Sequence, residues 1–202
     1  LEKGEGKTML EKGPAYNSEM DKTESEDTAW PAYRHDAARS GYIAASVSTD
    51  LKRSWEAQLP ALPSSPTMAK GKMFVASTNS HTVYGLDGNT GKRLWDYTTG
   101  GRVDTPPTYY KGRVLFGSRD GWVYCLNAAD GTLAWRFRAA PMTRLILDHG
   151  RLASAWGLHG SVLIHEDKAY VSAGHSSFLD GGIYVYVLDP QTGEILQKEQ
   201  IY

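Results

Sequence analysis

The sequence has almost no cysteine, no excess of charge of one sign and no long hydrophobic run. Cys125 is the single cysteine, so the chain forms no internal disulfide and cannot build a zinc or redox site from paired cysteines. The 22 Lys and Arg residues against 23 Asp and Glu residues give a formal net charge of -1, which argues against binding to a nucleic-acid backbone. The apolar stretches are far shorter than the roughly 20 residues needed to cross a bilayer. We therefore expect neither a nucleic-acid partner nor a membrane span.

Aromatic residues and glycine are plentiful. Six Trp and twelve Tyr stand against four Phe, and there are 21 Gly residues. This composition favours many short strands joined by frequent turns over a helix bundle. The sequence therefore predicts an all-β fold.

A repeat sets the architecture. The segment Tyr84–Trp95 recurs as Tyr124–Trp135 and again as Tyr186–Gln197, and its glycines Gly91 and Gly131 are 40 residues apart. A period near 40 residues with several short strands in each unit is typical of β-propeller blades. The sequence therefore predicts a β-propeller built of four-stranded antiparallel blades.

The second copy of the repeat can be divided into four strands, A to D, at 103–109, 113–118, 122–126 and 133–137. Glycine-containing tight turns separate them, as expected for an antiparallel meander. We expect Trp95 and Trp135, at the end of their copies, to be buried between neighbouring blades. In the third copy Gln197 replaces the tryptophan, so its contact with a neighbour should be smaller.

The chain divides into three parts. Residues 1–29 are polar and are interpreted as a linker or the tail of an upstream domain, and 30–50 as a lead-in segment. Residues 51–202 are interpreted as a partial propeller, with an isolated strand D near 51–58, blades near 60–98, 100–138 and 159–199, and an insertion at 139–158. Since position 1 is not Met and three blades do not close a ring, we expect the chain to have been longer. The remaining blades would come from a second chain, another copy or a longer precursor.

Candidate binding residues follow from the strand directions. In a meander the D-to-A and B-to-C connections emerge on one face, which we call the loop face, and variable loops on a repeated scaffold commonly carry binding sites. We expect the insertion and the loop at 175–182 to pack together there. The candidates placed on the loop face are His81, Arg102, Asp104, Arg119, His159, His175, Ser176 and Asp180.

Each candidate also has a plain structural explanation. The sequence places no carboxylate beside His159 and His175, as a catalytic or metal site would need. Ser177 and His175 lack the nucleophile-elbow motif of a hydrolase. Arg102 and Asp104, two residues apart, favour an ion pair between blades. On the opposite face, the segment 87–91 has the oxygen spacing of the start of a calcium loop, but turn chemistry explains it fully. No metal site is expected, and the catalytic residues stay undefined.

The pattern Ala or Gly, Asp, Thr-Gly and Trp resembles the repeat of pyrroloquinoline-quinone (PQQ) dehydrogenases and of the outer-membrane assembly lipoprotein, over about residues 51 to 199. The segments 30–41, 101–109 and 176–183 resemble large bacterial proteins that carry this quinoprotein-like propeller. We expect a periplasmic or other extracytoplasmic location.

Three functions stay open. The favoured one is a non-catalytic propeller that binds a protein or glycan on the loop face and needs no cofactor. The second, suggested by the resemblance alone, is a PQQ-dependent dehydrogenase with PQQ and calcium. The single cysteine argues against it, because many such enzymes place a vicinal cysteine pair beside the quinone. The third is a polysaccharide lyase or hydrolase that acts on acidic sugars through His159, His175, Arg102 or Tyr109.

Overall fold

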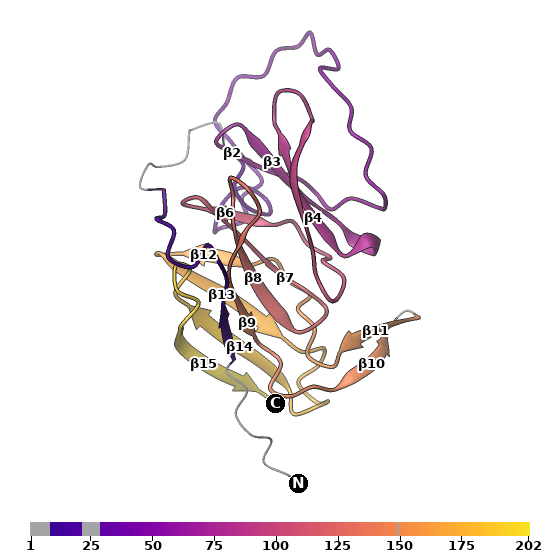
Figure 1. Cartoon of the computed structure of the whole chain (residues 1–202), viewed down its shortest axis with the longest axis vertical. Helices are drawn as coiled ribbons and strands as arrows, with labels where there is room; N and C mark the ends of the chain where they lie inside the picture. The colour runs from indigo at the N-terminus through magenta and orange to yellow at the C-terminus, as the bar shows by residue number, and fades with distance from the viewer. Residues whose placement is uncertain (1–8, 22–28, 149) are drawn as a thin grey trace.

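The computed structural model describes residues 9–21, 29–148 and 150–202 (Figure 1). Strands dominate these ranges, and the one helical element within them is the short 3-10 turn η1, Thr78–Ser80. Across the described ranges, no helix has the length and apolar character that a membrane crossing requires.

Twelve of the strands form three four-stranded sheets, each a meander whose strands follow chain order and pair antiparallel. We call these sheets blades 1, 2 and 3. The predicted all-β fold of antiparallel four-stranded blades, three of them in an incomplete propeller, is confirmed. Blade 1 comprises β2 (Thr67–Ala69), β3 (Lys72–Ser77), β4 (Thr82–Asp87) and β5 (Arg93–Thr98); blade 2 comprises β6 (Thr108–Tyr110), β7 (Arg113–Gly117), β8 (Trp122–Asn127) and β9 (Leu133–Arg138); blade 3 comprises β12 (Leu163–His165), β13 (Lys168–Ala173), β14 (Ile183–Leu188) and β15 (Ile195–Ile201).

The first strand of blade 2 is shorter than the sequence suggested. The strand β6 begins at Thr108, whereas a strand over 103–109 was expected. Pro106 and Pro107 lack the backbone N–H that a ladder needs, so regular pairing cannot begin before them. Val103 is nevertheless fully buried, which explains why the segment has the apolar character of a strand.

The turn glycine of a repeat contacts the indole ring of the tryptophan in the preceding repeat. Trp95 Nε1 donates to Ala128 O at 3.1 Å, and Trp135 Nε1 donates to Pro190 O at 3.2 Å. A Cβ on Gly131 would lie 2.7 Å from the Trp95 ring, and one on Gly193 would lie 2.7 Å from the Trp135 ring. Both glycines have a φ of +73°, so close approach and backbone conformation both require glycine. Trp95 and Trp135 are buried, as expected, and Gln197 is exposed.

The isolated strand expected near 51–58 is not formed, and no strand of the described ranges pairs with this segment. Its tryptophan still makes the repeated contact. Trp55 Nε1 donates to Gly88 O at 3.0 Å, and its ring occupies the space beside Gly91, where a Cβ would lie only 2.3 Å away. The indole contact therefore forms without the strand that usually carries it.

An additional strand, β1 (Leu10–Lys12), pairs antiparallel with β9 and makes blade 2 five-stranded. The polar composition of 1–29 does not predict this strand. The segment that follows β1 is hydrogen-bonded to Arg113, whose side chain is almost fully buried. Its guanidinium donates to Ala15 O at 3.2 Å, to Ser18 Oγ at 2.9 Å and to Ser18 O at 2.6 Å. The division of the chain into tail, lead-in and propeller stays a prediction.

Replacing Arg113 by Met should release this N-terminal segment. The variant loses every guanidinium donor to Ala15 and Ser18, so the free energy of unfolding should fall by about 2 to 3 kcal/mol. The amides of Gly13 and Ala15, which bond to Ala134 O and Leu133 O, should exchange faster with deuterium. Arg93→Met, at an exposed position of β5, is the control. Unchanged protection of both amides would show that Arg113 does not hold the segment.

The insertion between blades 2 and 3 forms a hairpin of β10 (Leu145–Asp148) and β11 (Arg151–Ser154). Figure 1 shows this hairpin projecting from the body of the three blades. Three exposed leucines, Leu145, Leu147 and Leu152, lie on one face of it, because Leu147 pairs with Leu152 and Leu145 is two residues away.

Candidate functional site

The insertion and the long loop of blade 3 pack together, as expected from the strand directions. Trp156 Nε1 donates to Asp180 O at 3.1 Å, and the Arg144 guanidinium forms an ion pair with the Asp180 carboxylate. The rings of His159 and His175 lie edge to face with centroids 4.4 Å apart. These contacts place both histidines and the insertion on the loop face.

Arg119 joins three segments of this face. Its Nε donates to Asp104 Oδ2 at 2.5 Å and its Nη1 to Asp148 Oδ2 at 2.7 Å, linking the connection before β6, the β7-to-β8 turn and the hairpin. Arg102 Nη2 lies 3.0 Å from Asp104 Oδ1, so the expected Arg102–Asp104 pair forms within one connection, and Arg119 provides the link beyond it. The side chains of Arg119, Asp104 and Asp148 are 14%, 17% and 19% exposed, so these pairs are shielded from solvent. We call Arg102, Asp104, Arg119 and Asp148 the charge network.

The histidine pair lies beside this network. His159 Nε2 is 3.4 Å from Arg119 Nη1, and burial together with the positive charge of Arg119 lowers the pKa of His159 to about 4. His159 is therefore neutral at pH 7. His175 is exposed, and its Nε2 lies 3.4 Å from Ser154 O. Asp104 and Asp148 bind Arg119, and within the described ranges no hydrogen bond joins a carboxylate to either ring.

The pKa of His159 predicts a pH-dependent stability. Between its folded pKa of about 4 and the ordinary value of 6.5, the unfolded chain binds a proton that the folded chain does not. Stability should therefore fall as the pH drops from 6.5 to 4. A His159→Gln variant should show a smaller fall in melting temperature between pH 6.5 and pH 4. A His165→Gln variant, at an exposed position, should show the same fall as the unmodified chain. Equal pH dependence in all three proteins would contradict the assignment.

The remaining predicted candidates have different surroundings. His81 lies near Arg102 and Arg151, burial is the main cause that lowers its pKa, and its Nε2 is buried without a hydrogen-bond partner among the described residues. Ser176 Oγ accepts from the backbone N–H of Phe178 and so shapes its own turn. Tyr109 is not part of this face, since it is buried against Phe74 beside the β6-to-β7 turn. Tyr109 therefore does not lie in one group with His159, His175 and Arg102.

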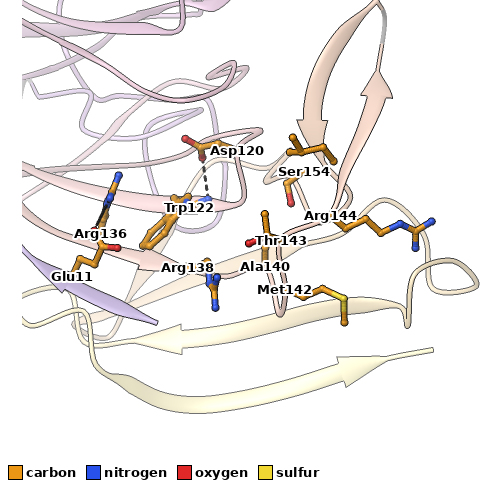
Figure 2. A pocket seen from close by; sticks show the side chains of 11 residues that line it. Glu11, Asp120, Trp122, Arg136, Arg138, Ala140, Met142, Thr143, Arg144 and Ser154 are labelled. Carbon is orange, nitrogen blue, oxygen red and sulfur yellow. Dashed lines mark hydrogen bonds and ion pairs between the residues drawn. The ribbon is translucent and has the colours of Figure 1, made fainter. Parts of the chain in front are cut away.

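A cavity of about 590 Å³ opens beside the charge network, between the end of β9 and the start of the insertion (Figure 2). Its wall comes from β1, from the β7-to-β8 turn and the start of β8, from β9, from the segment that follows β9, and from the start of β10 and the end of β11. The lining residues are Glu11, Asp120, Trp122, Arg136, Arg138, Ala140, Met142, Thr143, Arg144, Leu145 and Ser154.

Three arginines line this cavity, and two of them already have anionic partners. Arg136 donates to Glu11 Oε2 from Nε at 2.8 Å and from Nη2 at 2.6 Å, and Arg144 pairs with Asp180 as described. Arg138 differs: its Nε is buried without a partner, and no ion pair or side-chain hydrogen bond of its guanidinium occurs within 9–21, 29–148 and 150–202. Among the cavity residues that the structure describes, Arg138 is therefore the one cation without an anionic partner.

The carboxylate of Asp120, in the cavity wall, accepts hydrogen bonds from neighbouring residues of the chain. Asp120 accepts from Tyr124 OH at 2.7 Å, Gly100 N at 3.0 Å and Trp122 N at 3.1 Å. Burial nevertheless raises its pKa. Asp120 therefore braces the wall and does not neutralise Arg138.

The candidates expected from the sequence do not include the cavity arginines Arg136 and Arg138. Arg136 and Arg138 alternate with Trp135 and Phe137, and a period of two places them together on the face opposite the buried rings. That signal was available in the sequence. Arg144 and Asp148 lie in the insertion, where no repeat or motif predicts their position.

The known proteins similar to this chain are outer membrane assembly factors and quinone-dependent alcohol dehydrogenases. A family model described as outer membrane protein assembly factor BamB matches residues 39–202. The chain is 30% identical over 159 residues to the dehydrogenase subunit of alcohol dehydrogenase (quinone) from Gluconobacter oxydans, covering 72% of this chain and 20% of that protein. It is 35% identical over 155 residues to the outer membrane protein assembly factor BamB of Francisella salina, covering 75% of this chain and 29% of that protein.

Solved structures agree on the fold. The quinohemoprotein alcohol dehydrogenase ADHIIG from Pseudomonas putida HK5 superposes with a TM-score of 0.70 at 20% identity, over 87% of this chain and 27% of that one. The europium-containing methanol dehydrogenase gives a TM-score of 0.60 at 20% identity, over 87% of this chain and 32% of that one. The chain thus spans about a fifth to a third of these relatives.

Proposed function

The chain belongs to the family described as outer membrane protein assembly factor BamB, within the quinoprotein-like propellers, and from this premise we propose that it is a non-catalytic binding module. Its loop face would take a protein or a glycan. Location in the cell envelope and completion of the ring by further blades are part of the same proposal, the blades coming from a second chain, another copy or a longer precursor.

The observation that carries this proposal is the contrast between two neighbouring features of the loop face. In the charge network, Arg119 binds both Asp104 and Asp148, so these groups hold loops together. The adjacent cavity is open and contains the uncompensated Arg138. A fixed charge network beside a cavity is the arrangement expected of a pre-organised binding surface.

A second candidate, a PQQ-dependent dehydrogenase, is favoured by the 30% identity to the Gluconobacter oxydans subunit. A calcium-bound quinone needs a cluster of oxygen ligands. In the described part of the chain, no three His, Cys, Asp or Glu side chains come together as such a cluster, and Asp104 and Asp148 both face Arg119. These residues do not fit the cofactor, so a dehydrogenase would have to hold it with other blades.

Site-specific photo-crosslinking tests the proposal. A photoreactive amino acid is placed at exposed loop-face positions, Leu152 or Phe178, and at exposed opposite-face positions, Asn89 or Asp130. In a cell-envelope extract and on a glycan array, defined adducts should form from the loop face alone. Adducts from the opposite face alone, from both faces equally or from neither would contradict it. A quinone absorbance band retained after PQQ and calcium are added, with alcohol oxidation, would favour the dehydrogenase instead.

A further inference from the structure

We propose that the cavity at the end of β9 binds one carboxylate of a protein partner, namely an Asp or Glu side chain flanked by apolar residues in a peptide segment, and that Arg138 is its anchor. This inference rests on the proposed function of the loop face as a binding surface. It goes further by naming the class of ligand and the residue that selects it.

The charge of the cavity specifies one anionic group. Arg136 is compensated by Glu11 and Arg144 by Asp180, while Asp120 is satisfied by neutral donors. Arg138 remains, with a buried Nε that has no partner in the described ranges. A buried guanidinium nitrogen without an acceptor is costly, and a carboxylate can accept two parallel N–H bonds from one guanidinium. A single carboxylate therefore fits the donors better than a multiply charged phosphate group does.

The apolar surroundings favour a peptide over an acidic sugar. Met142 and Leu145 line the cavity and are 57% and 58% exposed, and the exposed Leu147 and Leu152 continue the apolar surface along the hairpin. Apolar neighbours of the acidic residue could cover these side chains. The indole of Trp122, on which a sugar ring could stack, is instead covered by the Arg136 guanidinium at 4.5 Å from the ring centroid.

The walls of the cavity are fixed before any ligand arrives. The backbone N–H of Arg138 donates to Met9 O at 2.6 Å, and those of Ala139 and Ala140 both donate to Gly121 O at 3.0 and 3.1 Å. Figure 2 shows Arg138 between Arg136 and the segment that carries Met142. The anchor thus stands on a strand end that is bonded on two sides, so binding requires little ordering of the site.

The test uses calorimetric titration of the full chain with the peptide acetyl-Leu-Glu-Leu-amide and its glutamine counterpart, acetyl-Leu-Gln-Leu-amide. The Glu peptide should bind with a Kd on the order of 0.1 to 1 mM, and the Gln peptide at least about tenfold more weakly, because a charge-assisted bond is lost. An Arg138→Gln variant should lose binding by a similar factor, and Arg138→Lys should fall between. Arg93→Gln, which changes the net charge equally at an exposed position of β5, should bind as the unmodified chain does.

Comparison of the two peptides on the unmodified chain keeps the inference testable even if an Arg138 variant does not fold. Equal affinity for both peptides, or unchanged affinity of a folded Arg138→Gln protein, overturns it. Galacturonate oligosaccharide is titrated in parallel, and Arg138-dependent binding of this sugar with no binding of the Glu peptide also overturns it. That last result leaves the proposed function intact, whereas loss of all loop-face adducts in the crosslinking experiment would remove the proposed function itself.

Discussion

Replacing Trp135 by Ala should lower the free energy of unfolding by about 3 to 5 kcal/mol, the range found for buried aromatic residues. The side chain is fully buried, and its indole fills the space above Gly193. Gly193 itself has no side chain that could fill the space left by the ring. The loss also removes the bond to Pro190 O, leaving that acceptor without the indole donor.

Chemical denaturation with a constant m-value measures this change. Trp95→Ala should cost slightly less, because Trp95 keeps 7% exposure. Gln197→Ala, at the equivalent position of blade 3, is the matched control and should change stability by less than about 0.5 kcal/mol, as for other exposed positions. A cost below about 1 kcal/mol for Trp135→Ala would contradict the idea that indoles join the blades.

Replacing Arg119 by Met should also be severe, at about 3 kcal/mol, because removing one partner of a shielded ion pair leaves carboxylates without compensation. Asp104 would keep only Arg102, which meets its Oδ1 outside hydrogen-bond geometry. Asp148 would lose its bond from the hairpin to blade 2, while the backbone bond from Ser154 N to Arg119 O would remain. The hairpin amides should therefore lose protection against hydrogen exchange as well.

A double-mutant cycle separates this charge effect from lost packing. If uncompensated charge is the cause, Asp104→Asn in the Arg119→Met background should recover at least about 1 kcal/mol, whereas in the unmodified chain it should destabilise. Arg151→Met, on the same hairpin but donating to Asn79 O at an exposed site, is the control and should cost less than about 1 kcal/mol. Additive losses from Arg119→Met and Asp104→Asn would show that the two side chains act independently.

The repeated parts of the fold were predictable because each blade is a local unit. Strand order, turn positions and the burial of Trp95 and Trp135 follow from spacings within one repeat. The strand directions also placed His159 and His175 on one face, where their rings touch. Local patterns sufficed wherever the interacting residues lie in the same or the next repeat.

The missed features depend on contacts between distant segments. The pairing of Leu10–Lys12 with β9 joins a three-residue polar strand to a partner far along the chain, and no local pattern encodes it. Asp148 reaches Arg119 only because the insertion folds back over the β7-to-β8 turn. Arg138 was accessible through the period of two in β9, but its missing partner is visible only in three dimensions.

The pairing of β1 with β9 also determines where a mechanical load would act. A pull on the chain ahead of Leu10 would be borne by the hydrogen bonds between these strands and by Arg113, and thus by blade 2. Blade 1 lies in the chain between β1 and β9, so tension would reach it only after the pairing of β1 with β9 was broken. In single-molecule stretching from the two termini, blade 1 would thus be shielded until β1 detaches, although it comes before blade 2 in the sequence.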